Sequence, residues 1–107
     1  MPVALQIGEE EIRAYLCGEI DHHLAGELRE TIDGACQRNN PKLLILDFGG
    51  VTFMDSSGIG LIMGRYRLME ELGGKLLVSQ IPAALKRVMQ LAGLEKLGVL
   101  DNGGTRQ

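Results

Sequence analysis

The fold is decided by residues 42–60, which read KLLILDFGGVTFMDSSGIG. Residues 42–48 form a continuous apolar run of strand length, which is typical of a central strand covered on both faces in an α/β sheet. After the octet 53–60, FMDSSGIG, apolar residues keep helical spacing up to the glycines at 73 and 74, where a helix is expected to end. The stretch therefore predicts a strand, a polar turn and a helix.

The rest of the chain also alternates between strand and helix patterns. Upstream, residues 3–7 and 11–20 predict an antiparallel hairpin, and Asp21 stands at the N-cap of a helix over 22–40. Downstream, KLLVSQ at 75–80 predicts a buried strand. Pro82 then fits the first turn of a helix that Gly93 ends, and LGVL at 97–100 predicts a short last strand. Residues 1–100 are expected to form one domain, and residues 101–107, DNGGTRQ, a polar and disordered tail.

This order of elements, β-β-α-β-α-β-α-β, predicts an α/β domain with a mixed, mostly parallel sheet and helices packed mainly on one side. Ligands and partners of such sheets meet the loops at the carboxyl ends of the strands. The octet lies at such an end, and the loop GEIDHH, residues 18–23, follows the preceding strand. If those two strands are parallel, the two loops are neighbours and form one composite surface site.

Composition restricts the class of protein. The 107 residues are 45% hydrophobic and 23% charged, with a net charge of -3, which is typical of one globular domain. No apolar run reaches the roughly 20 residues that span a bilayer, and the first residues do not resemble a signal peptide, so a cytoplasmic protein is expected. Without a basic cluster or a Trp, nucleic acid is not an expected ligand. Cys17 and Cys36 are expected to be reduced, half-buried small apolar residues.

The octet admits several interpretations. One of Asp55, Ser56 and Ser57 is expected to cap the following helix. A hydrolase nucleophile is disfavoured because the elbow pattern GxSxG is absent, and adjacent His22 and His23 point about 100° apart on a helix, so a metal site is disfavoured too. GIGLIMG departs by one residue from the dinucleotide fingerprint, which leaves a small nucleotide-binding module as a weak alternative.

A phosphorylation site at the start of this helix is the fourth interpretation. The helix N-terminus tolerates the roughly -1.5 to -2 charge of a phosphoserine, so the modification would act on a partner and not on the fold. Gly58 and Gly60 have no side chain, so a kinase loop or a partner backbone can approach closely. Met54 and Ile59 offer apolar contacts to such a partner.

A family resemblance favours this fourth interpretation. GEIDHH followed by LDFGGVTFMDSSGIGLIMGRYR resembles the anti-sigma factor antagonists that carry the STAS domain, and GEIDHH narrows the likeness toward the sporulation branch. The likeness covers about residues 3–100. It implies a STAS domain without catalytic activity or cofactor.

The resemblance also implies a partner-switching mechanism. The unphosphorylated protein would bind an anti-sigma factor that is also a serine kinase holding ADP or ATP, and so free a sporulation sigma factor. Phosphorylation of Ser56 would release that partner, and a metal-dependent serine phosphatase would reset the switch. Ser57 would be a structural neighbour and cap. The partner surface expected around Ser56 comprises Glu19, Asp21, His22, Met54, Asp55, Ser57, Gly58, Ile59 and Gly60.

Three points stay open at the level of sequence. Family members usually end in a further amphipathic helix on the sheet, which DNGGTRQ cannot form. Spacing cannot separate Ser56 from Ser57, and a STAS regulator of a general stress or other signalling pathway would carry the same motif.

Overall fold

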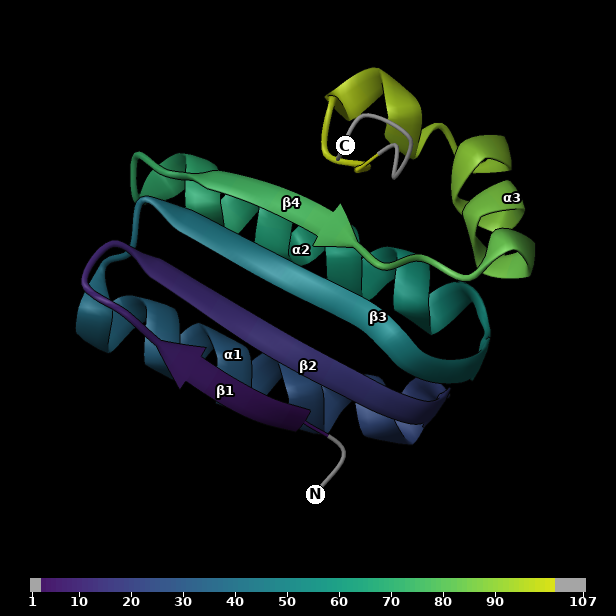
Figure 1. The fold of residues 1–107 in the computed structure, drawn as a ribbon, viewed down its shortest axis with the longest axis horizontal. Helices are drawn as coiled ribbons and strands as arrows, with labels where there is room; N and C mark the ends of the chain where they lie inside the picture. The colour runs from purple at the N-terminus through teal and green to yellow at the C-terminus, as the bar shows by residue number, and fades with distance from the viewer. Residues whose placement is uncertain (1–2, 102–107) are drawn as a thin grey trace.

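The structure, a computed structural model, describes residues 3–101 (Figure 1). Its elements follow the predicted order as far as the third helix. They are β1 (Val3–Ile7), β2 (Glu11–Ile20), α1 (His22–Asn39), β3 (Leu43–Met54), α2 (Ser56–Glu71), β4 (Lys75–Ser79), α3 (Ala83–Leu91) and a short 3-10 helix, η1 (Leu94–Leu97).

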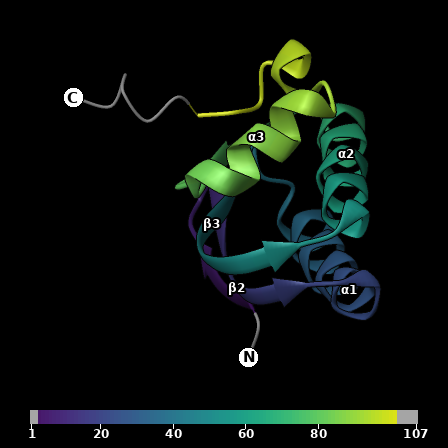
Figure 2. The same ribbon diagram turned by 90° about the vertical axis from the view of Figure 1, so that its right-hand side faces the viewer.

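The strands form one mixed sheet in the order β1-β2-β3-β4, and three of them are parallel. The hairpin of β1 and β2 is antiparallel, as predicted, whereas β2, β3 and β4 run in the same direction. Helices α1 and α2 lie side by side against one face of the sheet, and α3 and η1 lie beyond the edge strand β4 (Figure 2). The predicted α/β class, with helices mainly on one side, is confirmed.

The predicted last strand over residues 97–100 is wrong in extent. Leu97 belongs to η1, and Gly98 turns the chain with a φ of 71°. Leu100 then makes a single parallel bridge to Val78 of β4. The reason is local, because a glycine in the left-handed region interrupts the extended backbone that a strand needs. The predicted tail lies outside the described residues from position 102 onward.

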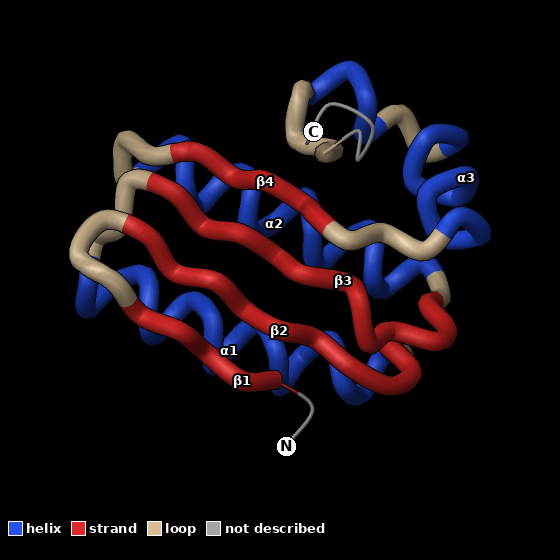
Figure 3. The backbone as a smooth tube through the Cα atoms, in the orientation of Figure 1, coloured by secondary structure: helices blue, strands red, loops and turns tan. Residues whose placement is uncertain are grey.

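Strand β3 is longer than the apolar run that predicted it. It continues through Gly49 and Gly50 to Met54, whereas β4 pairs with it only as far as Asp47 (Figure 3). Beyond that point β3 pairs with β2 across a register irregularity between Tyr15 and Cys17. Gly50 fits this close approach, because a Cβ atom there would lie 2.9 Å from Cys17 Cβ. Gly50 therefore serves strand pairing, and the two glycines do not end the strand.

The core lies between the sheet and the helices α1 and α2. The predicted face of β2, with Ile12, Ala14 and Leu16, is buried there together with Leu46 and Phe48 of β3. No helix within residues 3–101 has the length and apolar character needed to cross a bilayer.

The prediction that both cysteines are half-buried is wrong. Cys36 of α1 is fully buried, and burial raises the pKa of its thiol to about 11. Cys17 is exposed because it lies on the opposite face of β2 from the core. The period-two pattern of the strand already places residue 17 on the outer face, together with Arg13 and Tyr15.

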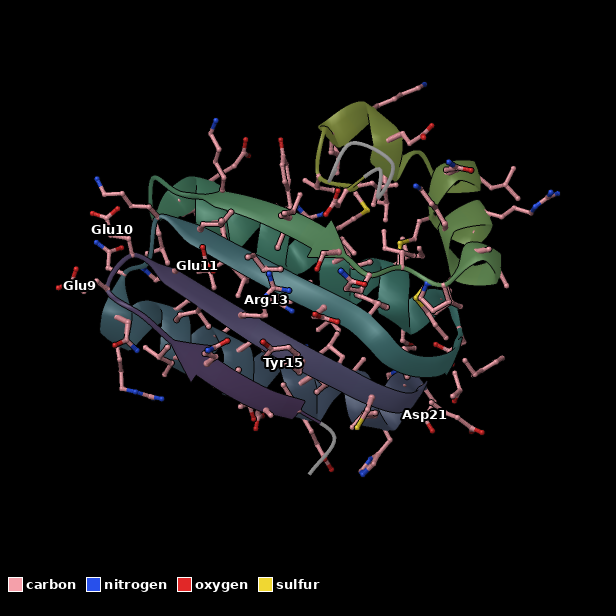
Figure 4. All side chains as sticks on the ribbon, viewed as in Figure 1. Glu9, Glu10, Glu11, Arg13, Tyr15 and Asp21 are labelled. Carbon is pink, nitrogen blue, oxygen red and sulfur yellow. The ribbon has the colours of Figure 1, made fainter. Side chains whose placement is uncertain are left out.

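The outer face of the sheet carries a polar network. Arg13 and Tyr15 project from this face, on the side away from α1 and α2 (Figure 4). Arg13 Nη1 donates a hydrogen bond of 2.9 Å to Asp47 Oδ2 and one of 3.4 Å to Ser79 Oγ. Because Asp47 is nine-tenths buried, this ion pair is partly shielded from solvent and links the three parallel strands.

Candidate functional site

The two loops singled out in the sequence meet at one end of the sheet. Glu19 pairs with Phe53 and Ile20 with Met54 in the parallel β2–β3 ladder. The N–H of Asp55 then donates to the carbonyl oxygen of Ile20 at 3.1 Å. The predicted adjacency of GEIDHH and the octet is therefore confirmed.

Each of these loops ends in an aspartate that caps a helix. Asp21 Oδ1 accepts the N–H of Leu24 at 2.9 Å and caps α1, as predicted. Asp55 Oδ1 accepts the N–H of Ser57 at 2.8 Å, and the Asp55 carbonyl oxygen accepts the N–H of Gly58 at 2.9 Å. Asp55 is therefore the N-cap of α2, and the capping role expected for Ser57 is wrong, because Ser57 already lies inside the first turn.

We expect an Asp55→Ala substitution to lower the free energy of unfolding by about 1 kcal/mol, because it removes the N-cap bond. Ser57→Ala is the matched control, since the N–H of residue 57 that makes the cap bond is kept, and its effect should stay within about 0.5 kcal/mol. Urea unfolding followed by circular dichroism measures both. Equal losses from the two variants would show that the Ser57 hydroxyl contributes to the cap.

Ser56 and Ser57 differ in exposure. Ser56, the first residue of α2, is exposed, whereas Ser57 is half-buried and faces the neighbouring helix α1. Asp55 already satisfies the N–H groups of Ser57 and Gly58. A group added to Ser56 Oγ would therefore project into solvent, and the capped first turn would stay intact.

The apolar surface around Ser56 differs from the prediction. Met54 is 6% exposed and packs on Gly58, where a Cβ atom would lie 2.3 Å from Met54 Cγ. Met54 and Gly58 therefore belong to the packing and not to the surface. Ile59 is half-buried and Gly60 is exposed. The exposed apolar side chain that the sequence analysis missed is Phe53, at 50% exposure. Strict alternation from the buried Val51 would turn Phe53 inward, so the strand pattern gave no signal for it.

The site is acidic on the side of β2. Glu19 and Asp21 are both exposed, and Asp55 is partly exposed at the start of α2. His22 lies on the other side, where it lines a groove between α1 and α2. Within residues 3–101, no three His, Cys, Asp or Glu side chains gather as a metal site would require. Gly58, Gly60 and Gly64 all lie within α2, so GIGLIMG does not form the loop that cradles a phosphate.

A buried ion pair joins the two helices that flank the site. Arg65 Nε of α2 lies 2.8 Å from Asp33 Oδ1 of α1 without forming a hydrogen bond, and Nη2 donates to Oδ2 at 3.3 Å. Burial raises the pKa of the Asp33 carboxyl and lowers that of the Arg65 guanidinium, and each partner opposes the shift of the other. The Arg65 side chain is only 7% exposed, and the carboxylate of Asp33 neutralises its charge inside the protein.

The comparisons of this chain with known proteins agree on one protein family. The STAS domain model matches residues 12–102. The anti-sigma F factor antagonist of Paenibacillus polymyxa is 37% identical over 103 residues, which cover 92% of this chain and 88% of that protein.

Two solved structures share the fold. The unphosphorylated form of the anti-sigma factor antagonist SpoIIAA superposes with a TM-score of 0.82 at 30% identity, covering 92% of this chain and 85% of SpoIIAA. The phosphorylated form of the Bacillus cell fate determinant SpoIIAA gives a TM-score of 0.75 at 30% identity, with coverage of 92% and 88%.

Proposed function

The chain belongs to the STAS domain family, and we propose that it acts as an anti-sigma factor antagonist controlled by phosphorylation of Ser56. In its unphosphorylated form it binds an anti-sigma factor that is also a serine kinase, and so releases a sporulation sigma factor. Phosphate on Ser56 ends that binding. A metal-dependent serine phosphatase removes the phosphate, and the chain itself catalyses no reaction.

The observation that carries this proposal is that Ser56 is exposed and directly follows Asp55, which already caps the helix. Because Asp55 already accepts the N–H groups of Ser57 and Gly58, the helix does not need a phosphate on Ser56 as its cap. The new charge would instead join the exposed carboxylates of Glu19 and Asp21. The same surface then becomes strongly anionic, and a partner that tolerates the hydroxyl meets a repulsive field.

The proposal is supported by relatives of matching length and by the two phosphorylation states named for SpoIIAA. The contact surface comprises Glu19, Asp21, His22, Asp55, Ser57, Ile59 and Gly60 around Ser56, with exposed Phe53 as its apolar contact. Met54 and Gly58 act beneath it by shaping the first turn of α2.

We expect the cognate anti-sigma kinase and ATP to add one phosphate to this protein, at Ser56. Intact-mass and peptide mass spectrometry after incubation measures the modification in the wild type, in Ser56→Ala and in Ser57→Ala. The phosphate should disappear in Ser56→Ala and persist in Ser57→Ala, because only Ser56 projects into solvent. An unmodified wild type, with the same kinase active on another antagonist, would reject this switch and leave the fold assignment intact.

A further inference from the structure

A groove runs between α1 and α2 from the phosphorylatable end of α2. Its volume is about 670 Å³, and its walls include Gly26 and Arg29 of α1 and Ser57, Gly60, Gly64 and Arg67 of α2. Ser57 is the direct neighbour of Ser56, so the groove is continuous with the proposed switch surface. The groove is open and its walls are as polar as they are apolar, which does not suit a deeply enclosed small ligand.

The glycines of this groove are not explained by the packing of the chain. Beyond the chain neighbours and the backbone of its own helix, a Cβ atom at Gly26, Gly60 or Gly64 would meet no atom of the described residues within 4 Å. Glycine is the least favourable residue in a helix interior after proline, so a helix that needs no close approach is expected to use alanine here. Gly58 and Gly74 differ, since a Cβ atom there would collide with Met54 or with the carbonyl oxygens of residues 41 and 42.

The charge of the groove is positive although the chain as a whole is acidic. Arg29 and Arg67 are exposed, and within residues 3–101 neither forms an ion pair or a hydrogen bond through its side chain. Arg29 lies near enough to Asp33 to favour its charged form, but the direct contact of Asp33 is with Arg65. The charge of Arg65 is neutralised by Asp33, and the exposed imidazole of His23 lies 3.2 Å from Glu27. Two arginines therefore remain available on opposite walls of a glycine-lined groove, an arrangement that suits an elongated anionic partner.

We infer that an acidic peptide segment of the anti-sigma factor docks in this groove, with its backbone close to Gly26, Gly60 and Gly64 and its carboxylates on Arg29 and Arg67. This inference rests on the proposed function and assigns a second contact beside Ser56. A protein segment fits better than a nucleic acid, because the described residues that line the groove include no Phe, Tyr or Trp on which bases could stack. The backbone N–H groups of the helix interiors are used within the helices, so carboxylates would meet side-chain donors.

The test measures affinity for the cognate anti-sigma kinase by titration calorimetry, using two groove variants. Arg29→Gln/Arg67→Gln removes the charges, and Gly60→Ala/Gly64→Ala fills the floor with methyl groups. Each pair should weaken binding at least tenfold, and the arginine pair should also reduce the dependence of affinity on salt. The glycine pair should raise the melting temperature by about 4 °C or more, because alanine favours the helix. Weaker binding by a more stable protein cannot come from unfolding.

Two control substitutions lie on α1, outside the groove. Gly34→Ala meets only the flexible end of Arg38, and Arg38→Gln removes an exposed charge from the last turn of α1. Both controls should bind like the wild type.

The possible outcomes separate the two proposals. Groove variants that bind within twofold of the wild type, while phosphorylation of Ser56 still abolishes binding, overturn the groove inference alone. If the arginine pair loses affinity and the glycine pair does not, the partner contacts only the surface charges. That result overturns docking of a peptide backbone against Gly60 and Gly64. A wild type that does not bind the kinase at all overturns both proposals.

Discussion

An Asp33→Ala substitution should lower the free energy of unfolding by about 3 kcal/mol, because it leaves a buried guanidinium without its counter-ion. The Arg65 side chain is 7% exposed, whereas that of Asp33 is 27% exposed. After the substitution, among residues 3–101, the Leu61 carbonyl oxygen at 3.3 Å remains as a hydrogen-bond acceptor for Arg65. Arg65→Met should cost less, since the carboxylate of Asp33 can recruit water. Urea denaturation of the two variants measures the difference.

The double variant Asp33→Ala/Arg65→Met is the control for this prediction. Removing both charges avoids an unpaired ion in the interior, so the double variant should be more stable than Asp33→Ala alone. If the two single losses simply add in the double variant, the 2.8 Å contact contributes no coupling and the helices are held by apolar packing.

A Ser56→Asp substitution should weaken binding to the anti-sigma factor by about 100-fold, since like charges opposed across an interface cost several kcal/mol. The new carboxylate would add to those of Glu19, Asp21 and Asp55 at the same end of the sheet. An aspartate in the first turn of α2 is favourable for the helix, so the variant should be at least as stable as the wild type. Surface plasmon resonance against the immobilised partner measures the affinity.

Two further substitutions at this position separate charge from size. Ser56→Asn has nearly the volume of the aspartate variant without its charge, and Ser56→Ala lacks the acceptor hydroxyl; both should keep most of the affinity. The difference in affinity between the Asp and Asn variants should become smaller at high salt, because salt screens exposed charges. Tight binding by Ser56→Asp, or equal weakening by Asp and Asn, would show that charge is not the off-switch.

The period-two and helical patterns were sufficient to predict most of the fold. The errors occurred at glycines, because a glycine is compatible both with the end of a strand and with a strand that continues. Gly49 and Gly50 resemble a strand end, but Gly50 lets β3 follow the irregular register of β2, which is visible only once both strands are paired. LGVL has the composition of a strand. In the structure its first residue, Leu97, ends the helix η1, and Gly98 then turns the chain.

The site was predictable in position and less so in its details. The rule that parallel strands end at the same edge was enough to place GEIDHH beside the octet. It could not show that Met54 turns inward onto Gly58 while Phe53 turns outward, because that depends on the extension of β3 past the apolar run. The groove was missed because its residues come from two helices. The recurrence of Gly60, Gly64 and Arg67 at spacings of four and three was the available signal.

The extension of β3 past the end of β4 has a consequence for the local stability of the segment that leads to Ser56. Beyond Asp47, β3 pairs with β2 but no longer with β4, so Ser56 follows a two-stranded arm of the sheet. Such an arm opens locally at a lower free energy than the middle of a sheet. Amide hydrogen exchange would therefore be faster in this arm than in the four-stranded region. Local opening of this arm would free the segment before Ser56, while the remainder of the sheet stays closed and the overall stability of the domain is unchanged.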